Sequence, residues 1–443
     1  MKNKNVQKGF LTMIQNPQTV KLLVIILFAL MYVLLLALPK IRAYIALACA
    51  AIFVLIGALP VRQVFSEINW NVLMMIAGTM GTVYFFIESK MPSLLADILI
   101  KRMPNVKWAI ISLSLFAGII SAFVDNVATV LMVAPIALTI SKKLNISPVL
   151  SIISIAVASN LQGAATLVGD TTSILLGGYA NMNFLDFFFM NGKIGMFWIV
   201  QCGAIVSTFV LLYIFRKDTQ PISIDDRTKV TDYFPTVMLL GTVVLLILAS
   251  FFPKEVKPEI TNGLICIILF IICLIREFIK DKDFTIIKKA IAEVDFFTLL
   301  LLGSLFVVIG GVSNVGIVND IGNFFLEITD NIFILYTLIV WVSVLLSAFI
   351  DNIPYIATML PIVTAMSNSL GGASVYVLYF GLLAGATLGG NLTPVGASAN
   401  ITAIGILRKA GYEVNSKTFM KVSVPFTLSA VLTGYVLVWL IWR

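Results

Sequence analysis

SAFVDNVATVLMVAPIA at residues 121–137 and SAFIDNIPYIATMLPIV at residues 347–363 are two copies of one segment in this chain of 443 residues. The copies lie 226 positions apart, and the identical pairs include Ser121/Ser347, Ala122/Ala348, Phe123/Phe349, Asp125/Asp351, Asn126/Asn352 and Pro135/Pro361. A second matched pair follows: GAATLVGDTTS at 163–173 and NLTPVGASAN at 391–400. Polar, Gly-rich interruptions at matching places in both halves of a membrane chain are typical of secondary transporters with one site shared by the halves.

The composition indicates an all-α polytopic membrane protein. Hydrophobic residues make up 60% of the chain and charged residues only 12%, against about 25% charged in soluble domains. Successive apolar runs of about 20 residues predict transmembrane helices, and we expect the first run, 20–38, to be a span rather than a cleaved signal. Lys and Arg gather in the short connections, which favours membrane orientation over nucleic-acid binding. The chain has no His, so any proton coupling would use carboxylates.

The apolar runs predict five spans in each half, and therefore about ten transmembrane helices. The predicted spans are 20–38, 41–59, 70–90, 147–180 (broken) and 194–215 in the first half, and 234–252, 260–279, 296–317, 375–407 (broken) and 420–441 in the second.

Two further apolar runs, 107–142 and 331–369, have Asp-Asn in the middle. Each follows an amphipathic stretch, 91–103 or 318–329. The flanks stay apolar up to the Asp-Asn pair, which favours a re-entrant hairpin over two full spans joined by a turn in water. Irregular backbone at membrane depth is tolerated only where protein shields it from lipid.

An odd number of spans per half predicts an inverted repeat. The expected organisation is an N-terminal repeat over 1–215, a linker over 216–233 and a C-terminal repeat over 234–443. The predicted loops on one side contain 21 of the 30 Lys and Arg residues, so we expect that side, with the linker, to be cytoplasmic in the inner or plasma membrane.

Asp125 and Asp351 are the most unusual residues of the apolar runs. A charged side chain at helix-centre depth costs about 2.5–3.5 kcal/mol on insertion scales, so it usually marks an ion path. Each Asp could instead only cap the second helix of its hairpin. The amide oxygens of Asn126 and Asn352 are suitable ligands for Na⁺, and a Na⁺ site formed by these four residues is a candidate.

The two broken spans supply the other candidate ligands. Gly permits unwinding, although small residues also serve close helix packing. The candidates in the breaks are Thr166, Gly169, Asp170, Thr172, Ser173, Asn391, Thr393, Gly396, Ser398 and Asn400.

The two breaks differ at one position, because Asp170 is matched by Ala397. The additional carboxylate makes Asp170 the candidate proton-exchanging group. Neither the hairpin tips nor the breaks contain Lys or Arg, so an anionic substrate would find helix N-termini but no guanidinium.

Glu67 and Glu293 occupy equivalent positions in Glu-Ile-Asn-Trp and Glu-Val-Asp-Phe, each just before a span. Charge at a helix start is the simpler explanation for them. The chain has no phosphate-binding loop and no nucleophile elbow, so neither an enzyme nor an ATP-driven pump is indicated.

On these motifs the chain resembles the ArsB/NhaD permeases of the ion transporter superfamily, and most of all the branch of NhaD-type Na⁺/H⁺ antiporters and the P protein. The resemblance covers nearly all of the chain beyond residue 60. It implies paired re-entrant hairpins, a homodimer and an elevator-like motion. Divalent anion:Na⁺ symporters are more distant relatives. One departure affects the ligand set: the branch continues the first break as Gly-Asp-Pro-Pro-Asn, whereas this chain has Gly169-Asp170-Thr171-Thr172-Ser173.

Three functions stay open from the sequence. The first is a secondary active cation/proton antiporter that uses Asp125, Asp170 and Asp351 with Na⁺ and/or H⁺ as coupling ions. The second is an anion carrier, for arsenite efflux or Na⁺-coupled di- or tricarboxylate transport. The third is a channel or membrane scaffold. The expected partners are the lipid bilayer and a small ion, with no nucleic acid and no bound cofactor, and an associated ATPase stays compatible with the chain.

Overall fold

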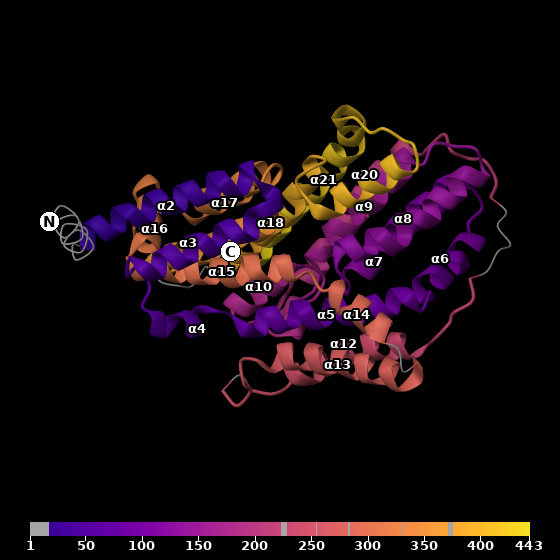
Figure 1. Ribbon diagram of the computed structural model, residues 1–443. Helices are drawn as coiled ribbons and strands as arrows, with labels where there is room; N and C mark the ends of the chain where they lie inside the picture. Colours follow the sequence, from indigo (N-terminus) through magenta and orange to yellow (C-terminus); the bar gives the residue numbers. More distant parts are fainter. Residues whose placement is uncertain (1–16, 223–227, 254, 282–283, 330, 371–374) are drawn as a thin grey trace.

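The computed structural model describes residues 17–222, 228–253, 255–281, 284–329, 331–370 and 375–443. The described chain is almost entirely helical (Figure 1), as the composition predicts. The helices of the first half are α2 (Pro17–Ala37), α3 (Arg42–Leu55), α4 (Val64–Glu67), α5 (Trp70–Glu88), α6 (Met91–Lys101), α7 (Val106–Ser121), α8 (Asn126–Lys143), α9 (Val149–Gly163), α10 (Thr171–Tyr179) and α11 (Met196–Ile214).

The second half repeats this order. Its helices are α12 (Phe234–Ser250), α13 (Thr261–Asp281), α14 (Phe284–Ala292), α15 (Phe296–Asn314), α16 (Ile317–Ile328), α17 (Ile332–Ser347), α18 (Asn352–Ser369), α19 (Val375–Gly389), α20 (Ser398–Lys409) and α21 (Ser416–Trp442). Short 3₁₀ turns lie at Pro39–Ile41 (η1), Val61–Gln63 (η2), Phe184–Phe187 (η3) and Gly390–Leu392 (η4). A small antiparallel ribbon, β1 (Phe189–Met190) and β2 (Lys193–Ile194), which the sequence analysis did not predict, precedes α11.

Both Asp-Asn runs form the predicted helix–turn–helix. α7 ends at Ser121 and α8 begins at Asn126, while α17 ends at Ser347 and α18 begins at Asn352. Both broken spans are interrupted, with α9 and α10 separated by residues 164–170. The turns are shielded by protein, because Asn126 and Asn352 are buried. Whether the hairpins are re-entrant stays a prediction.

Seven described helices are long and apolar enough to cross a membrane, and α7, α9, α12 and α17 are shorter apolar helices. The burial of these helices varies widely. Only 22% of the apolar window of α2 is buried within the chain, against 83% for α19. α19 therefore belongs to the core, and α2 presents apolar side chains outward, where lipid would contact them. Neither the number of about ten spans nor the inversion of the repeats is decided by these lengths, and both stay predictions.

The two halves interlock through matched contacts. α5 packs on α13 and α3 packs on α15, while α11 packs on α21. The second helix of each break crosses to the other half: α10 contacts α18, and α20 contacts α8. Figure 1 shows α20 (yellow) beside α9 and close to α8 (purple). Each hairpin is therefore held partly by the broken span of the opposite half.

The predicted linker over 216–233 follows the ends of α6 and α7. The backbone N–H groups of Val106 and Lys107 donate to the carbonyls of Gln220 (3.0 Å) and Asp218 (2.8 Å). Thr228 donates to the Asp97 carboxylate through its backbone N–H (2.8 Å) and its hydroxyl (2.6 Å). Linker residues 223–227 and the first sixteen residues of the expected N-terminal repeat lie outside the described residues. The three boundaries stay predictions.

Candidate functional site

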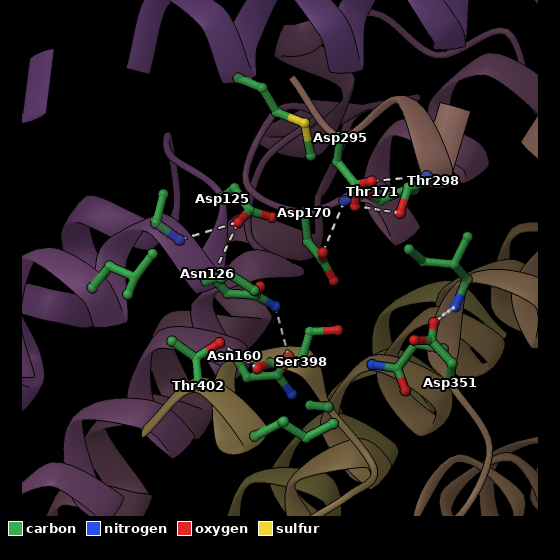
Figure 2. Close-up of a pocket in the computed structure, with 18 of the residues that line it drawn as sticks. Asp125, Asn126, Asn160, Asp170, Thr171, Asp295, Thr298, Asp351, Ser398 and Thr402 are labelled. Atoms are coloured by element: carbon green, nitrogen blue, oxygen red, sulfur yellow. Dashed lines mark hydrogen bonds between the residues drawn. The ribbon is translucent and has the colours of Figure 1, made fainter. Parts of the chain in front are cut away.

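A cavity of about 380 Å³ lies where the two hairpin turns and the two breaks meet. Its walls also include α5, the start of α3 and the start of α15. Residues more than 200 positions apart thus line one space, and Figure 2 shows Asp125 and Asp170 on one side of it and Asp351 on the other.

Four helices begin at this cavity with an Asp as the N-cap. The Asp125 carboxylate accepts from the backbone N–H of Val127 (2.9 Å) and Ala128 (3.2 Å) at the start of α8. The Asp351 carboxylate accepts from the N–H of Ile353 (3.0 Å) at the start of α18. Capping satisfies backbone donors that have no partner within the helix, and the helix dipole favours the negative charge there. Capping and a position in the cavity therefore coexist in these residues.

Asp170 and Asp295 are the other two capping residues. Asp170 accepts from the N–H of Thr171 (2.8 Å) and from the Thr172 hydroxyl (2.8 Å) at the start of α10. Asp295 accepts from the N–H (2.9 Å) and the hydroxyl (2.6 Å) of Thr298 in α15. A fifth helix, α20, also begins at the cavity, but its N-cap Ala397 has no side-chain acceptor. The Asp170/Ala397 difference in sequence thus distinguishes a capped helix start from an uncapped one.

Asp351 has a basic partner that the sequence analysis did not predict. The Nη1 atom of Arg42, the first residue of α3, lies 2.6 Å from Asp351 Oδ2. The expectation that the site contains no guanidinium is therefore wrong. Arg42 is 309 positions from Asp351, and long-range packing, including that of α3 on α15, brings it to the cavity.

The two tip asparagines have different partners. Asn126 Nδ2 donates to Asn160 Oδ1 (2.8 Å), and Asn160 Nδ2 donates to the Thr387 carbonyl (2.9 Å). Asn352 Oδ1 accepts from the Ser347 hydroxyl within its own hairpin. The sequence analysis missed Asn160. An amide side chain within an apolar run, at the position that matches Thr387 in the other half, was an available signal.

Several predicted ligands instead join a break to a tip or close the break itself. The hydroxyls of Thr166 and Thr393 donate to the carbonyls of Ala122 and Ala348, respectively, at matching positions of the two halves. Ser173 Oγ donates to the Gly163 carbonyl (3.0 Å), and Asn400 Nδ2 donates to the Gly390 carbonyl (3.2 Å) at the matching place.

Gly169 and Gly396 are required where each break touches its tip. A Cβ at Gly169 would lie 2.8 Å from the Gly163 carbonyl oxygen and 2.9 Å from that of Ala122. A Cβ at Gly396 would lie 2.5 Å from the Gly390 oxygen and 2.8 Å from that of Ala348. These distances leave no room for a side chain, so the repeated glycines permit close backbone approach.

The structure brings eight of the fourteen predicted residues to the cavity wall and leaves six behind it. The lining residues are Asp125, Asn126, Asp170, Thr172, Asp351, Asn352, Gly396 and Ser398. The residues outside the lining are Thr166, Gly169, Ser173, Asn391, Thr393 and Asn400. The polar lining residues that the sequence analysis did not select are Arg42, Tyr84, Asn160, Thr171, Glu293, Asp295, Thr298 and Thr402.

The donor set suits an alkali cation better than a transition metal. Within the described residues no group of three or more His, Cys, Asp or Glu side chains could hold a metal ion. The lining offers carboxylate, amide and hydroxyl oxygens, the ligands that hard cations take. The amide oxygens of Asn391 and Asn400, behind the wall, are buried without a hydrogen-bond partner.

A bundle of apolar helices around a polar cavity, with hairpin turns and broken helices meeting at it, defines an integral multi-pass membrane transporter. The family model described as "Citrate transporter" (CitMHS) matches residues 32–385. The chain therefore belongs to this family, which lies in the ion transporter superfamily that the repeated motifs predict. It is a family of transporters, not of enzymes.

Individual relatives agree with this assignment. The chain is similar to an uncharacterized transporter of Mycobacterium tuberculosis (28% identity; 90% of this chain and 93% of that protein). It is similar to a 46 kDa membrane protein of Mycobacterium leprae (30%; 89% and 92%). It is also similar to the P protein of Homo sapiens (25%; 88% of this chain and 56% of that protein).

The fold is similar to that of the Alcanivorax borkumensis YdaH transporter, with a TM-score of 0.57 and 15% identity over 85% of this chain and 86% of that chain. Neisseria gonorrhoeae MtrF gives a TM-score of 0.52 with 14% identity over 85% and 83%. At these identities the likeness concerns the fold alone.

Proposed function

We propose that this protein is a secondary active cation/proton exchanger of the Na⁺/H⁺ type, with Asp125 and Asp170 as the groups that carry the exchanged ions. The observation that carries the proposal is the charge of the cavity wall. Five acidic side chains line it, together with a single guanidinium: Asp125, Asp170, Asp295, Glu293 and Asp351 against Arg42.

The one guanidinium is already engaged by Asp351. Within the described part of the chain, neither Asp125 nor Asp170 forms an ion pair with Lys or Arg. Burying carboxylates without a counter-ion is unfavourable, so binding a proton or a metal cation stabilises this arrangement. Competition between the two ions for the same carboxylates would couple their movement.

The neighbours of Asp170 suit this role. The Thr172 hydroxyl lies 2.8 Å from the Asp170 carboxylate and 2.9 Å from the Thr387 hydroxyl of the other half. A hydroxyl can donate to an ionised carboxylate and offer its own oxygen to a cation. Thr172 therefore links the titratable group to the second half of the chain.

The exchange would proceed by alternating access, with the hairpins and broken spans moving in an elevator-like manner as a homodimer. The contacts of α10 with α18 and of α20 with α8 support the joint movement of the hairpins and broken spans, because they tie both hairpins and both breaks into one body.

A carboxylate carrier is the second candidate, and two features favour it. The start of α20 has no capping side chain, so its free N–H groups could donate hydrogen bonds to an anion. Arg42 could act as a second anchor if Asp351 released it. The family description and the relation to citrate transporters agree with this candidate.

Transport by the purified protein in proteoliposomes separates the two candidates. Imposed Na⁺ and pH gradients would be combined with a panel of citrate, succinate and arsenite. We expect Na⁺-driven proton movement without any added anion, and its loss in Asp125→Asn/Asp170→Asn. Uptake of citrate or succinate with no cation/proton exchange would reject the exchanger in favour of the carrier.

A further inference from the structure

We propose that a second cavity, at the start of α5, is the entrance of the transport path on the membrane side opposite to the mouth of the central cavity. This cavity has a volume of about 430 Å³. Its polar lining includes Glu67, Asn69, Asn71, Tyr179, Glu259 and Asn262. The inference rests on the proposed function, because it concerns the path of the exchanged cation.

The repeated motifs relate the two cavities. Asn69 caps α5 by accepting from the N–H of Val72 (3.1 Å), as Asp295 caps α15. Glu67 and Asn69 lie 226 positions before Glu293 and Asp295. Glu293 and Asp295 line the central cavity, whereas Glu67 and Asn69 line the second cavity. In the inverted repeat that the sequence predicts, equivalent segments lie on opposite sides of the membrane. On that prediction the second cavity corresponds to a mouth on the other side.

The same two helices line both cavities. α5 contributes Trp70 and Asn71 to the second cavity and Tyr84 and Ile87 to the central one. From Trp70 to Ile87 the α-helix rises by about 26 Å, close to the hydrocarbon thickness of about 30 Å. α10 likewise runs from Thr171 and Thr172 at the central cavity to Gly178 and Tyr179 at the second.

A small space extends from the central cavity toward the second one. Its volume is about 10 Å³, and Ile76 and Thr79 of α5 and Ile174 of α10 line it together with Asp125 and Asp170. It shares no lining residue with the second cavity, and Ile76 and Ile174 lie between the linings of the two cavities along α5 and α10. A space of this size holds about one water molecule, so the path is closed between the candidate ion-carrying carboxylates and the second cavity.

The lining of the second cavity suits a hydrated cation. Asn262 is 5% exposed, and its Oδ1 atom has no hydrogen-bond partner. A buried acceptor without a donor is unfavourable, and a hydrated inorganic cation supplies the missing donor or takes the oxygen directly. Glu67 and Glu259 add two carboxylates to the wall, against one ammonium from Lys257, which donates to Asn183 Oδ1 (2.6 Å).

The test is the sidedness of thiol labelling in sealed membrane vesicles of known orientation. Cys202 is first replaced by Ser, because it is exposed and would react with the reagents. Cys49, Cys266 and Cys273 are buried and can stay. Ser66→Cys, a near-isosteric change at an exposed position of the second cavity, reports on that cavity, and Thr402→Cys reports on the central cavity. Glu259→Cys, at another exposed position of the second cavity, replaces Ser66→Cys as the reporter if that variant does not fold. Membrane-impermeant methanethiosulfonates of positive and negative charge are the probes.

We expect the two reporters to react from opposite sides of the membrane. The positively charged reagent should react on the order of tenfold faster than the negatively charged one in the second cavity, and the label should stop transport. Labelling of both positions from the same side, or full transport by a protein completely labelled at the second cavity, would overturn the inference. If the reporters reacted from opposite sides but the anionic reagent reacted faster, the second cavity would still be the entrance of the path. A cation as the transported ion would then be rejected. Failure of the unlabelled protein to exchange cations for protons would instead count against the proposed function.

Discussion

Arg42 and Asp351 form an ion pair across 309 residues of sequence, with Nη1 of the first 2.6 Å from Oδ2 of the second. The pair joins the start of α3 to the turn of the second hairpin. Asp125, at the matching position of the first hairpin, has no such partner within the described residues and lies in the same cavity as Asp295. The two tips are thus alike in sequence but differ in their charged neighbours. The Asp125 carboxylate is not neutralised by a basic side chain within the described residues, so it is the better candidate to bind a cation.

Replacing Arg42 should expose this difference. Arg42→Ala leaves Asp351 as a partly buried carboxylate without a basic partner, so we expect a loss of about 1–3 kcal/mol in unfolding free energy. Added Na⁺ should restore part of the loss, since a ligand that binds only the folded state stabilises it. Thermal unfolding in detergent against Na⁺ concentration measures both effects. The control is Arg42→Ala/Asp351→Asn, which has no unpaired charge and should not respond to Na⁺ beyond the response of the parent. An equal response in both variants would contradict the assignment.

Asp170 should determine the proton dependence of transport. Asp170→Asn keeps an oxygen that can cap α10 but has no titratable group, so we expect transport to become independent of pH while folding is retained. Ala397→Asp, at the matching position of the second break, should not rescue it because it lies at the start of a different helix. Transport rates at a series of pH values check this. If the pH dependence of transport stayed the same as in the parent, the exchanged proton would have to be assigned to another carboxylate.

Asp125→Asn separates ion binding from capping. An Asn cap should cost from a few tenths to about 1 kcal/mol, so the variant should insert and stay monodisperse in detergent. It should not transport, and its stabilisation by Na⁺ should decrease. Asp295→Asn is the matched comparison, with the same change at another capping residue of the same cavity. Near-parental transport by Asp125→Asn would assign this Asp to capping alone.

Gly169→Ala and Gly396→Ala should each destabilise the protein. The added Cβ would lie 2.8 Å or less from a backbone carbonyl oxygen, and overpacking of this kind costs about 1–3 kcal/mol. Gly405→Ala is the control, since a Cβ there meets nothing within 4 Å and lies on the same α20 helix that follows Gly396. Thermal unfolding of the three variants in one detergent gives the comparison. Equal melting temperatures for Gly405→Ala and Gly396→Ala would mean that the break relaxes around the new methyl group.

The helical class, the long apolar helices and the two helix–turn–helix segments could be predicted from the sequence, because each depends on a local pattern. An apolar run with Asp-Asn at its centre has to turn there and cap the next helix, and both Asp125 and Asp351 do so. The interruptions of the two broken spans also follow from a local pattern. Gly169 and Gly396 lie where the backbone of the break closely approaches other backbone carbonyl oxygens.

Only the tertiary structure decided which polar side chains face the cavity. Thr166 and Thr393 looked like ligands but are hydrogen-bonded to the tips, while Arg42 and Asp295 became lining residues through the packing of α3 on α15. Sequence patterns report on the turn or face of one helix, with a period of a few residues. The charge of a cavity depends on which helices lie side by side, and that is settled by long-range packing between halves of the chain.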